Sequence, residues 1–251
     1  MAEASLSPAA RAKASSANTV WHGGEDLAPR LREALAQRGD PISALRFRHE
    51  ALEMRLGKRA PEPALEALRR RDLEKIYAEG YEAKESQGFF TGRGRRDGAD
   101  EEFIGIAGKM PLGAARAWRF ADAAWKLVDA RPRHVEVFLD CATHAARLDD
   151  EKIVLTEYIV DMAYGLAALA AKGTRVGLTI VGKAGGGVYV ALAAPAARVT
   201  SLYGAEIQVL PGAALAAILG ESHEETLAFA EYRASGVADE ELKLGFVPGA
   251  Q

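Results

Sequence analysis

A glycine-rich junction in the second half of the chain constrains the fold more than any other stretch. Residues 175–182 (RVGLTIVG) form an almost continuously apolar run, which predicts a β-strand covered on both faces, as in a parallel sheet. Three consecutive glycines follow at 185–187, and the apolar segment after them, which ends near Pro195, predicts a short helix. A strand that turns directly into a helix is the building unit of an α/β domain.

The same alternation extends on both sides of this junction. Further strands are predicted at 103–108, 134–141, 197–204 and 205–212, and helices at 113–130, 152–171, 213–219 and 221–234. The acidic residues at 149–151 lie where the positive end of a helix dipole favours them, and Gly173 provides a stop for the same helix. Residues 101–251 are therefore expected to form one α/β domain.

The first hundred residues differ in composition from this domain. Residues 1–20 are small and polar, which predicts a flexible tail, and residues 21–100 are expected to be a helical extension that ends in a loop. Helix-breaking residues at 39–41 and 61–63 separate two or three short helices, the last of which is expected to stop at Gly80.

The predicted loop covers residues 87–102, which are rich in glycine and charge and show no periodicity. Arg93, Arg95 and Arg96 lie within it. They either anchor a phosphate or an acidic partner, or they are solvated side chains of a surface loop, and the second interpretation is favoured.

Composition excludes several classes of protein. With 251 residues, of which 49% are hydrophobic, the chain can fill a sizeable core. Its net charge of -3 gives no indication of nucleic-acid binding. The single cysteine, Cys141, cannot form an internal disulfide, and neither a secretory signal nor an apolar run of membrane-spanning length is found. We therefore expect a soluble, cytoplasmic protein.

Motifs of nucleotide-binding and metal-dependent enzymes are incomplete in this sequence. Residues 177–184 (GLTIVGKA) match a phosphate-binding loop up to Ala184, which stands where a Ser or Thr would hold magnesium. The glycines at 185–187 lack the third glycine of a dinucleotide fingerprint, and the five histidines are scattered without metal-ligand spacing. Cys141 has no indicated base, so we expect a buried small residue there, no nucleophile and no metal site.

Two interpretations of the glycine run follow from the residues. The first turn of a helix offers N–H groups without intrahelical acceptors and the positive end of the helix dipole. Glycines let another molecule approach that backbone closely, so the turn is suited to stabilise an oxygen that becomes negative during a reaction. Alternatively, the glycines only permit tight packing between strand and helix. The residues alone give the two interpretations equal weight.

A longer stretch carries a family resemblance. The strand ending at Asp140, the helix with its acidic first turn, the run GKAGGGVYV, the Ala-Arg-Val at 197–199 and the strand at 205–210 occur in a specific order and spacing. Together they resemble the acyl-CoA carboxyltransferase branch of the crotonase (ClpP-like) superfamily, and most closely the gamma subunits of biotin-independent malonate decarboxylases. The resemblance covers roughly residues 103–225.

This resemblance implies a crotonase-like fold of repeated ββα turns with an active site shared between this chain and a separate beta subunit. In such enzymes a malonyl thioester, carried on the CoA-like prosthetic group of an acyl carrier protein, loses carbon dioxide to leave an acetyl thioester. No covalently bound cofactor is expected. The implied oxyanion donors are the backbone N–H groups of Gly186, Gly187 and Val188, and the implied substrate-binding residues are Lys183, Gly185 and His144.

Two other functions remain open at this point. One is the carboxyltransferase half of a biotin-dependent acyl-CoA carboxylase, which would use the same glycine turn to polarise the ureido oxygen of biotin. The other is a non-catalytic crotonase-like partner, in which the fold serves as an interaction surface and the helical N-terminal segment docks another subunit.

Overall fold

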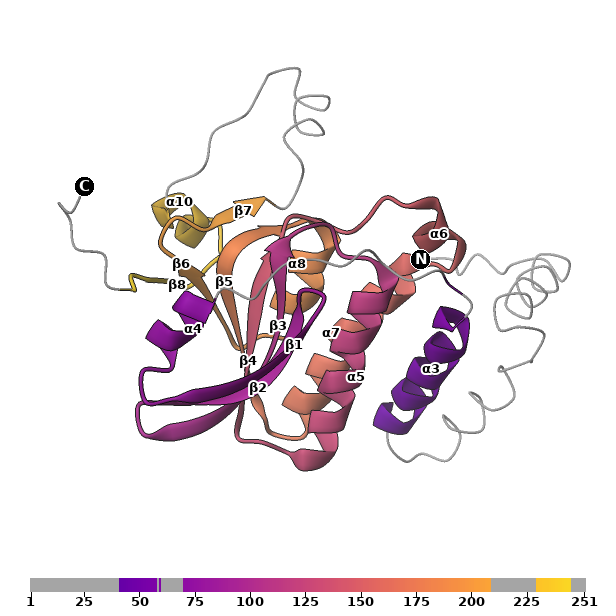
Figure 1. Cartoon of the computed structure of the whole chain (residues 1–251), viewed down its shortest axis with the longest axis horizontal. Coiled ribbons are helices and arrows are strands. Elements are labelled where there is room, and N and C mark those ends of the chain that lie inside the picture. Colours follow the sequence, from indigo (N-terminus) through magenta and orange to yellow (C-terminus); the bar gives the residue numbers. More distant parts are fainter. Residues whose placement is uncertain (1–40, 58, 60–69, 209–228, 245–251) are drawn as a thin grey trace, which may run out of the picture. The chain divides into compact units, whose positions relative to one another are not determined.

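The computed structural model describes residues 41–57, 59, 70–208 and 229–244 (Figure 1). The chain divides into two compact units, Met1–Ala60 and Pro61–Gln251. The helix described in the first unit is α3 (Pro41–Leu56). It begins at the predicted break, because a proline at the first helical position lacks only an N–H that would have no intrahelical acceptor.

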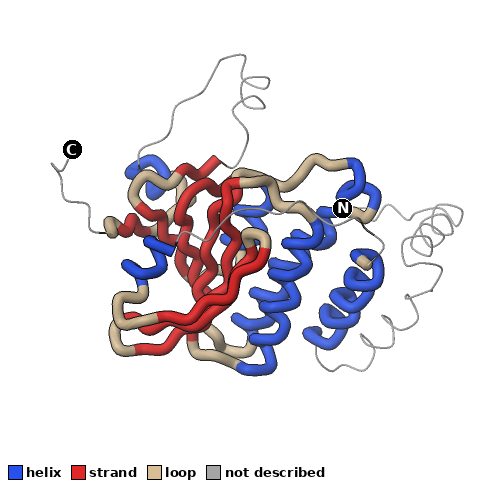
Figure 2. The backbone as a smooth tube through the Cα atoms, in the orientation of Figure 1, coloured by secondary structure: helices blue, strands red, loops and turns tan. Residues whose placement is uncertain are grey.

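The second unit is built on one mixed β-sheet (Figure 2). Its described strands are β1 (Tyr81–Ser86), β2 (Phe89–Arg96), β3 (Ala99–Lys109), β4 (His134–Cys141), β5 (Arg175–Gly185), β6 (Arg198–Leu202), β7 (Glu206–Gln208) and β8 (Glu240–Leu242). Strands β1 to β3 pair antiparallel, and β3 to β6 then run parallel in chain order. β8 pairs with β6, and β7 pairs with the end of β5. β5 therefore lies inside the sheet, as its apolar sequence predicts.

Two long helices pack against one face of this sheet, whereas a short helix contributes Leu73 and Ile76 to the core on the other face. The described helices of the unit are α4 (Arg70–Ile76), α5 (Ala114–Ala130), α6 (Leu148–Lys152), α7 (Leu155–Ala171), α8 (Gly186–Ala193) and α10 (Phe229–Ala234). α5 and α7 lie side by side (Figure 1). A Cβ added at Gly165 of α7 would lie 2.9 Å from the Cβ of Ala124 of α5, so small residues set the spacing of the two helices.

Aromatic rings form a core on the other face of the sheet. Phe103 and Phe138 belong to neighbouring strands, with ring centroids 5.8 Å apart. Tyr77 stacks on Phe103 at 5.3 Å, and Phe90 stacks on Phe138 at 6.2 Å. All four rings are at most 2% exposed, so they are fully part of the buried core on this face.

The loop predicted at residues 87–102 is wrong, because most of this segment forms the antiparallel β2–β3 hairpin. Its glycines make room for the aromatic core. A Cβ added at Gly92 would overlap the ring of Phe103, and one added at Gly105 would overlap the ring of Phe90. The expected boundary between residues 100 and 101 falls inside β3.

The three arginines of this hairpin are engaged in ion pairs within the unit. The pairs are Arg93 with Glu102 (2.5 Å), Arg95 with Glu79 (3.3 Å) and Arg96 with both Glu101 (2.9 Å) and Glu136 (3.3 Å). Each guanidinium therefore already faces a carboxylate of the same chain, which weakens the interpretation of these residues as an anion anchor.

The helix expected at 152–171 begins three residues later, as α7, and the acidic residues before it form the separate short helix α6. Val154 separates them with a φ of 61°, a left-handed conformation that is rare for a β-branched residue. Within α6 the buried carboxylate of Asp150 accepts a hydrogen bond from the backbone N–H of Ala114 at 3.0 Å. The acidic turn thus stabilises the start of α5, a different helix from the one it was expected to stabilise.

The other predicted elements within the described residues are confirmed. β3, β4, β5 and β6 correspond to the strands expected at 103–108, 134–141, 175–182 and 197–204, and α5 and α8 to the expected helices. β7 and α10 match parts of the segments at 205–212 and 221–234. The tail at 1–20 and the helix at 213–219 lie outside the described residues. Among the described helices, none has the length and apolar character that crossing a membrane requires.

The contact between Gly105 and Phe90 gives a prediction on stability. We expect Gly105→Ala to lower the free energy of unfolding by about 1–3 kcal/mol or more, because the added methyl group overpacks the aromatic core. In a Phe90→Leu background the same change should be less harmful, since the smaller side chain leaves room for the methyl group. Chemical denaturation of the four chains measures this coupling, and strictly additive losses would contradict the packing.

Candidate functional site

The glycine junction lies where β5 passes into α8, at the carboxyl end of the parallel strands. α8 begins at Gly186, so the N–H groups of Gly186, Gly187 and Val188 belong to its first turn. Helix geometry gives these groups no intrahelical acceptor, and the helix dipole makes this end positive. The junction can therefore present several N–H donors to one oxygen atom.

The neighbouring glycines meet different steric demands. A Cβ at Gly185 would overlap the backbone carbonyl of Ala142, so this glycine permits close packing between two chain segments. Gly186 has a φ of 54°, in the left-handed region that favours glycine. At Gly187, by contrast, no heavy atom of the described chain would lie within 4 Å of an added Cβ. Packing thus explains Gly185, whereas the space beside Gly187 is consistent with access for another molecule.

The segment that follows β4 lies beside this turn. An added Cβ at Gly186 would be 3.0 Å from the hydroxyl oxygen of Thr143 and 3.8 Å from Nδ1 of His144. The segment is held by the backbone N–H of Leu112, which donates to the carbonyl of Thr143 at 2.8 Å. The structure therefore brings His144 to the predicted donors, and it adds Thr143, which the sequence did not single out.

Lys183 points its ammonium group at a carboxylate. Its Nζ lies 2.8 Å from Oε2 of Glu206, on the neighbouring strand β7, and the side chains of both are about half exposed. The hydrogen bond that Lys183 donates to Glu206 raises the pKa of Lys183, so the charge is retained. A substrate carboxylate at this position would have to share Lys183 with Glu206, which the sequence did not indicate as a partner.

Cys141 is a buried residue, as expected. Its thiol donates to the carbonyl oxygens of Met110 and Thr143 at 3.3 and 3.2 Å. Burial raises the pKa of this thiol to about 11, so it stays protonated at neutral pH. The thiol therefore does not act as a nucleophile at neutral pH in this structure.

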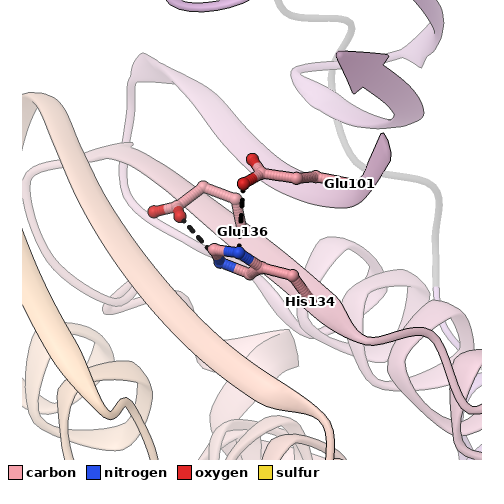
Figure 3. Close-up of side chains that lie close together, drawn as sticks. All are labelled: Glu101, His134 and Glu136. Carbon is pink, nitrogen blue, oxygen red and sulfur yellow. Dashed lines mark ion pairs between the residues drawn. The ribbon is translucent and has the colours of Figure 1, made fainter. Parts of the chain in front are cut away.

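A second polar cluster lies at the opposite, amino end of the strands (Figure 3). We define the ion-pair cluster as Arg96, Glu101, His134 and Glu136. Nδ1 of His134 lies 3.1 Å from Glu101, and Nε2 lies 3.2 Å from Glu136. Both carboxylates are nearly inaccessible to solvent, and the hydroxyl of Thr179 donates to Glu136 at 2.7 Å.

The ion-pair cluster balances its own charge. Burial opposes protonation of His134, but the hydrogen bonds to Glu101 and Glu136 outweigh it and raise its pKa to about 9. Burial likewise opposes ionisation of Glu101, but His134 and Arg96 outweigh it and lower its pKa. Ligand atoms of Glu101, His134 and Glu136 lie within 4.8 Å of one another, the spacing of a metal site. A divalent ion would have to displace both the guanidinium of Arg96 and the proton of His134, so the residues do not favour one.

Comparison with known proteins shows the fold. No protein-family model and no curated protein matches the sequence. The Pseudomonas malonate decarboxylase MdcD-MdcE hetero-dimer superposes over 75% of this chain and 83% of its own, with a TM-score of 0.59 and 20% identity. Transcarboxylase 12S (TM-score 0.55, 16% identity) and the beta subunit of P. aeruginosa geranyl-CoA carboxylase (0.58, 13%) superpose over 75% and 76% of this chain. This chain spans 40% and 46% of their lengths.

These similarities define the class of structure. The described sheet and its helices have the α/β fold of crotonase-like carboxyltransferases, as the sequence resemblance implies. Of these three structures, malonate decarboxylase is the one whose chain this fold covers most fully. At identities of 20% or less the similarity establishes the fold and no particular activity.

The ion-pair cluster predicts a pH window for stability. The folded pKa of His134 is raised above its ordinary value of 6.5, so its contribution is complete below that pH and is lost as the pH rises through about 9. The pKa of Glu101 is lowered from 4.5, so its contribution is complete above that pH and is lost as the pH falls. The stabilisation from this cluster is therefore greatest between pH 4.5 and 6.5.

We expect the free energy of unfolding to decrease by about 1–2 kcal/mol between pH 6 and pH 9, since partial exposure of the imidazole screens its ion pairs. Urea denaturation at the two pH values measures the difference. His134→Gln should show a smaller pH dependence, whereas His144→Gln, at an exposed position outside the cluster, should retain that of the natural chain. Equal pH dependence in all three chains would contradict this role of His134.

Proposed function

We propose that this chain is the gamma subunit of a malonate decarboxylase and acts on a malonyl thioester. The observation that carries the proposal is the glycine junction on a crotonase-like fold, where the first N–H groups of α8 meet open space at Gly187. Thr143 and His144, two side chains that can hydrogen-bond a polar substrate, lie beside the preceding residue, Gly186.

The proposed reaction breaks the bond between the carboxylate carbon and the α-carbon of the malonyl group. Carbon dioxide leaves, and the electron pair passes into the thioester to form an enolate, which takes a proton from water at carbon to give the acetyl thioester. Negative charge develops on the thioester oxygen during bond cleavage. The N–H groups of Gly186, Gly187 and Val188 are the proposed donors to this oxygen, and such donors lower the barrier because the charge is larger in the transition state than in the substrate.

Two further parts of the proposal concern binding. Lys183, Gly185 and His144 are proposed to contact the substrate, with Lys183 shared between Glu206 and the malonyl carboxylate. The prosthetic group of an acyl carrier protein, which is CoA-like, would present the thioester, so the chain itself needs no covalently bound cofactor. A solved structure of Pseudomonas malonate decarboxylase with coenzyme A supports this ligand chemistry for the fold.

A partner subunit belongs to the proposal. The malonate decarboxylase structures with this fold are a hetero-dimer and hetero-tetramers. We propose that this chain pairs with a beta subunit in the same way and that the active site is completed by that subunit. The alternative is the carboxyltransferase half of a biotin-dependent carboxylase, which the similarity to transcarboxylase 12S and geranyl-CoA carboxylase favours.

Reconstitution tests the two functions. The chain is purified with a carboxyltransferase-like beta subunit from the same genome, and acetyl thioester is measured with malonyl groups on acyl carrier protein and on CoA. Biotin-independent release of acetyl thioester supports the decarboxylase. Transfer of the carboxyl group to biotin would favour the carboxylase instead, and activity with neither substrate would reject both enzymes in favour of a non-catalytic partner.

The glycine turn gives a separable prediction. We expect Gly187→Leu to reduce kcat by about 10²-fold or more, because the side chain would occupy the space from which the thioester oxygen reaches the donors. The midpoint of thermal unfolding should change little, since an added Cβ meets no described atom within 4 Å. Val190→Leu, at a half-exposed position on the same helix, is the matched control and should retain turnover. An unchanged kcat in Gly187→Leu would refute the donor assignment.

A further inference from the structure

The carboxylate of Asp140 lies next to Gly182 and Lys183, just before the glycine junction. Asp140 is the last but one residue of β4 and is 1% exposed. Its Oδ1 accepts a hydrogen bond from the backbone N–H of Lys183 at 2.8 Å. A Cβ added at Gly182 would overlap the same carboxylate, so the absence of a side chain at Gly182 leaves the space that Asp140 occupies.

The pairing of β4 with β5 shows why this contact is needed. The two strands stay in register from His134–Arg175 to Leu139–Ile180, and the next pair is Cys141 with Ala184. Asp140 alone therefore stands opposite three residues of β5, at 181–183. An irregularity of this kind leaves backbone groups outside the regular ladder and redirects the strand. The Asp140 carboxylate satisfies one of these groups, the N–H of Lys183.

The redirected strand leads straight into the proposed donors. After Ala184, which is again paired with β4, Gly185 packs on the carbonyl of Ala142, and α8 begins at Gly186. The orientation of the first turn of α8 thus depends on how β5 is held at Lys183, three residues earlier.

We propose that Asp140 is a positioning residue, which fixes the irregular end of β5 so that the N–H groups at Gly186 and Gly187 point at one oxygen position. Its kinetic consequence rests on the proposed function, whereas its effect on the backbone does not. Asp140 acts through the Lys183 amide and does not contact the substrate. A role in proton transfer is the competing hypothesis, because a buried carboxylate near a reaction site can also act as a general acid or base.

Two substitutions separate these roles. Asp140→Asn keeps the size and one oxygen acceptor, whereas Asp140→Ala removes the acceptor. We expect Asp140→Ala in the reconstituted complex to lower kcat by about 10-fold to 100-fold with KM within about threefold, since the donors act mainly in the transition state. Asp140→Asn should restore most of kcat and keep the pH profile. A loss in Asp140→Asn as large as in Asp140→Ala, or a shifted pH profile, would show proton transfer and overturn the positioning role.

Hydrogen–deuterium exchange provides a readout that needs no activity. We expect amides of residues 183–188 to exchange at least about tenfold faster in Asp140→Ala than in the natural chain or Asp140→Asn. Asp150→Ala is the matched control, because Asp150 is also a buried carboxylate that accepts a backbone N–H, at the start of α5. It should destabilise the chain without this local change. Equal exchange in Asp140→Ala and the natural chain would overturn the inference.

A double substitution tests the placement itself. Gly182→Ala alone should destabilise the chain, because the methyl group overlaps the Asp140 carboxylate. In the Asp140→Ala background the methyl group enters vacated space, so the combined loss of stability should be smaller than the sum. Fast exchange at 183–188 should persist, since the acceptor is still missing. Additive losses would contradict the placement, and if the natural complex does not decarboxylate, exchange and coupling alone decide the role of Asp140.

Discussion

The parallel pairing of β4 with β5 is the constraint on which the rest of the structure depends. It is regular until Leu139 and Ile180 and then irregular at Asp140. The regular part buries apolar side chains against α5 and α7 on one face and the aromatic core on the other. After the irregular part, Cys141 and Ala184 form one more pair, and the chain then passes from β5 into α8 at Gly186. The regular stretch of these two strands therefore stabilises the fold, and the stretch that follows it leads to the residues of the proposed site.

Polar groups on β4 follow the same division. Alternate residues share one face of a strand, so His134 and Glu136 lie on the same face as Phe138 and Asp140. At the amino end, Arg96 and His134 compensate two buried carboxylates, which ties three neighbouring strands together without a free charge. At the carboxyl end, the carboxylate of Asp140 accepts a hydrogen bond from the backbone N–H of Lys183 instead. The charged groups at the amino end of β4 therefore hold neighbouring strands together, whereas the one at the carboxyl end holds the backbone of β5.

Sequence patterns predicted the parallel strands and α5 because buried segments carry a continuous or periodic apolar signal. They failed for the hairpin at 87–102, where glycines lie under rings that come from other parts of the chain. They also failed at Val154, since nothing in the residue type indicates a left-handed conformation. The sequence predicted that the glycine run and His144 belong to one site, and the structure places His144 beside Gly186. The contacts of Thr143, Glu206 and Asp140 with this junction were not predicted, because each joins residues that are distant in sequence.

The sequence by itself determined the class of fold and the location of the glycine junction. Both depend on local information: the period of apolar residues, and the freedom of the backbone where side chains are missing. Only the tertiary structure decided which atoms lie where the side chain of each glycine would be. The missing side chain of Gly182 leaves room for the carboxylate of Asp140, and that of Gly185 leaves room for the carbonyl of Ala142. Beside Gly187, no atom of the described residues would come within 4 Å of an added Cβ. The reason is that a glycine does not indicate, from the neighbouring sequence, which atoms will fill the space beside it. Those atoms come from a segment that is distant in the chain.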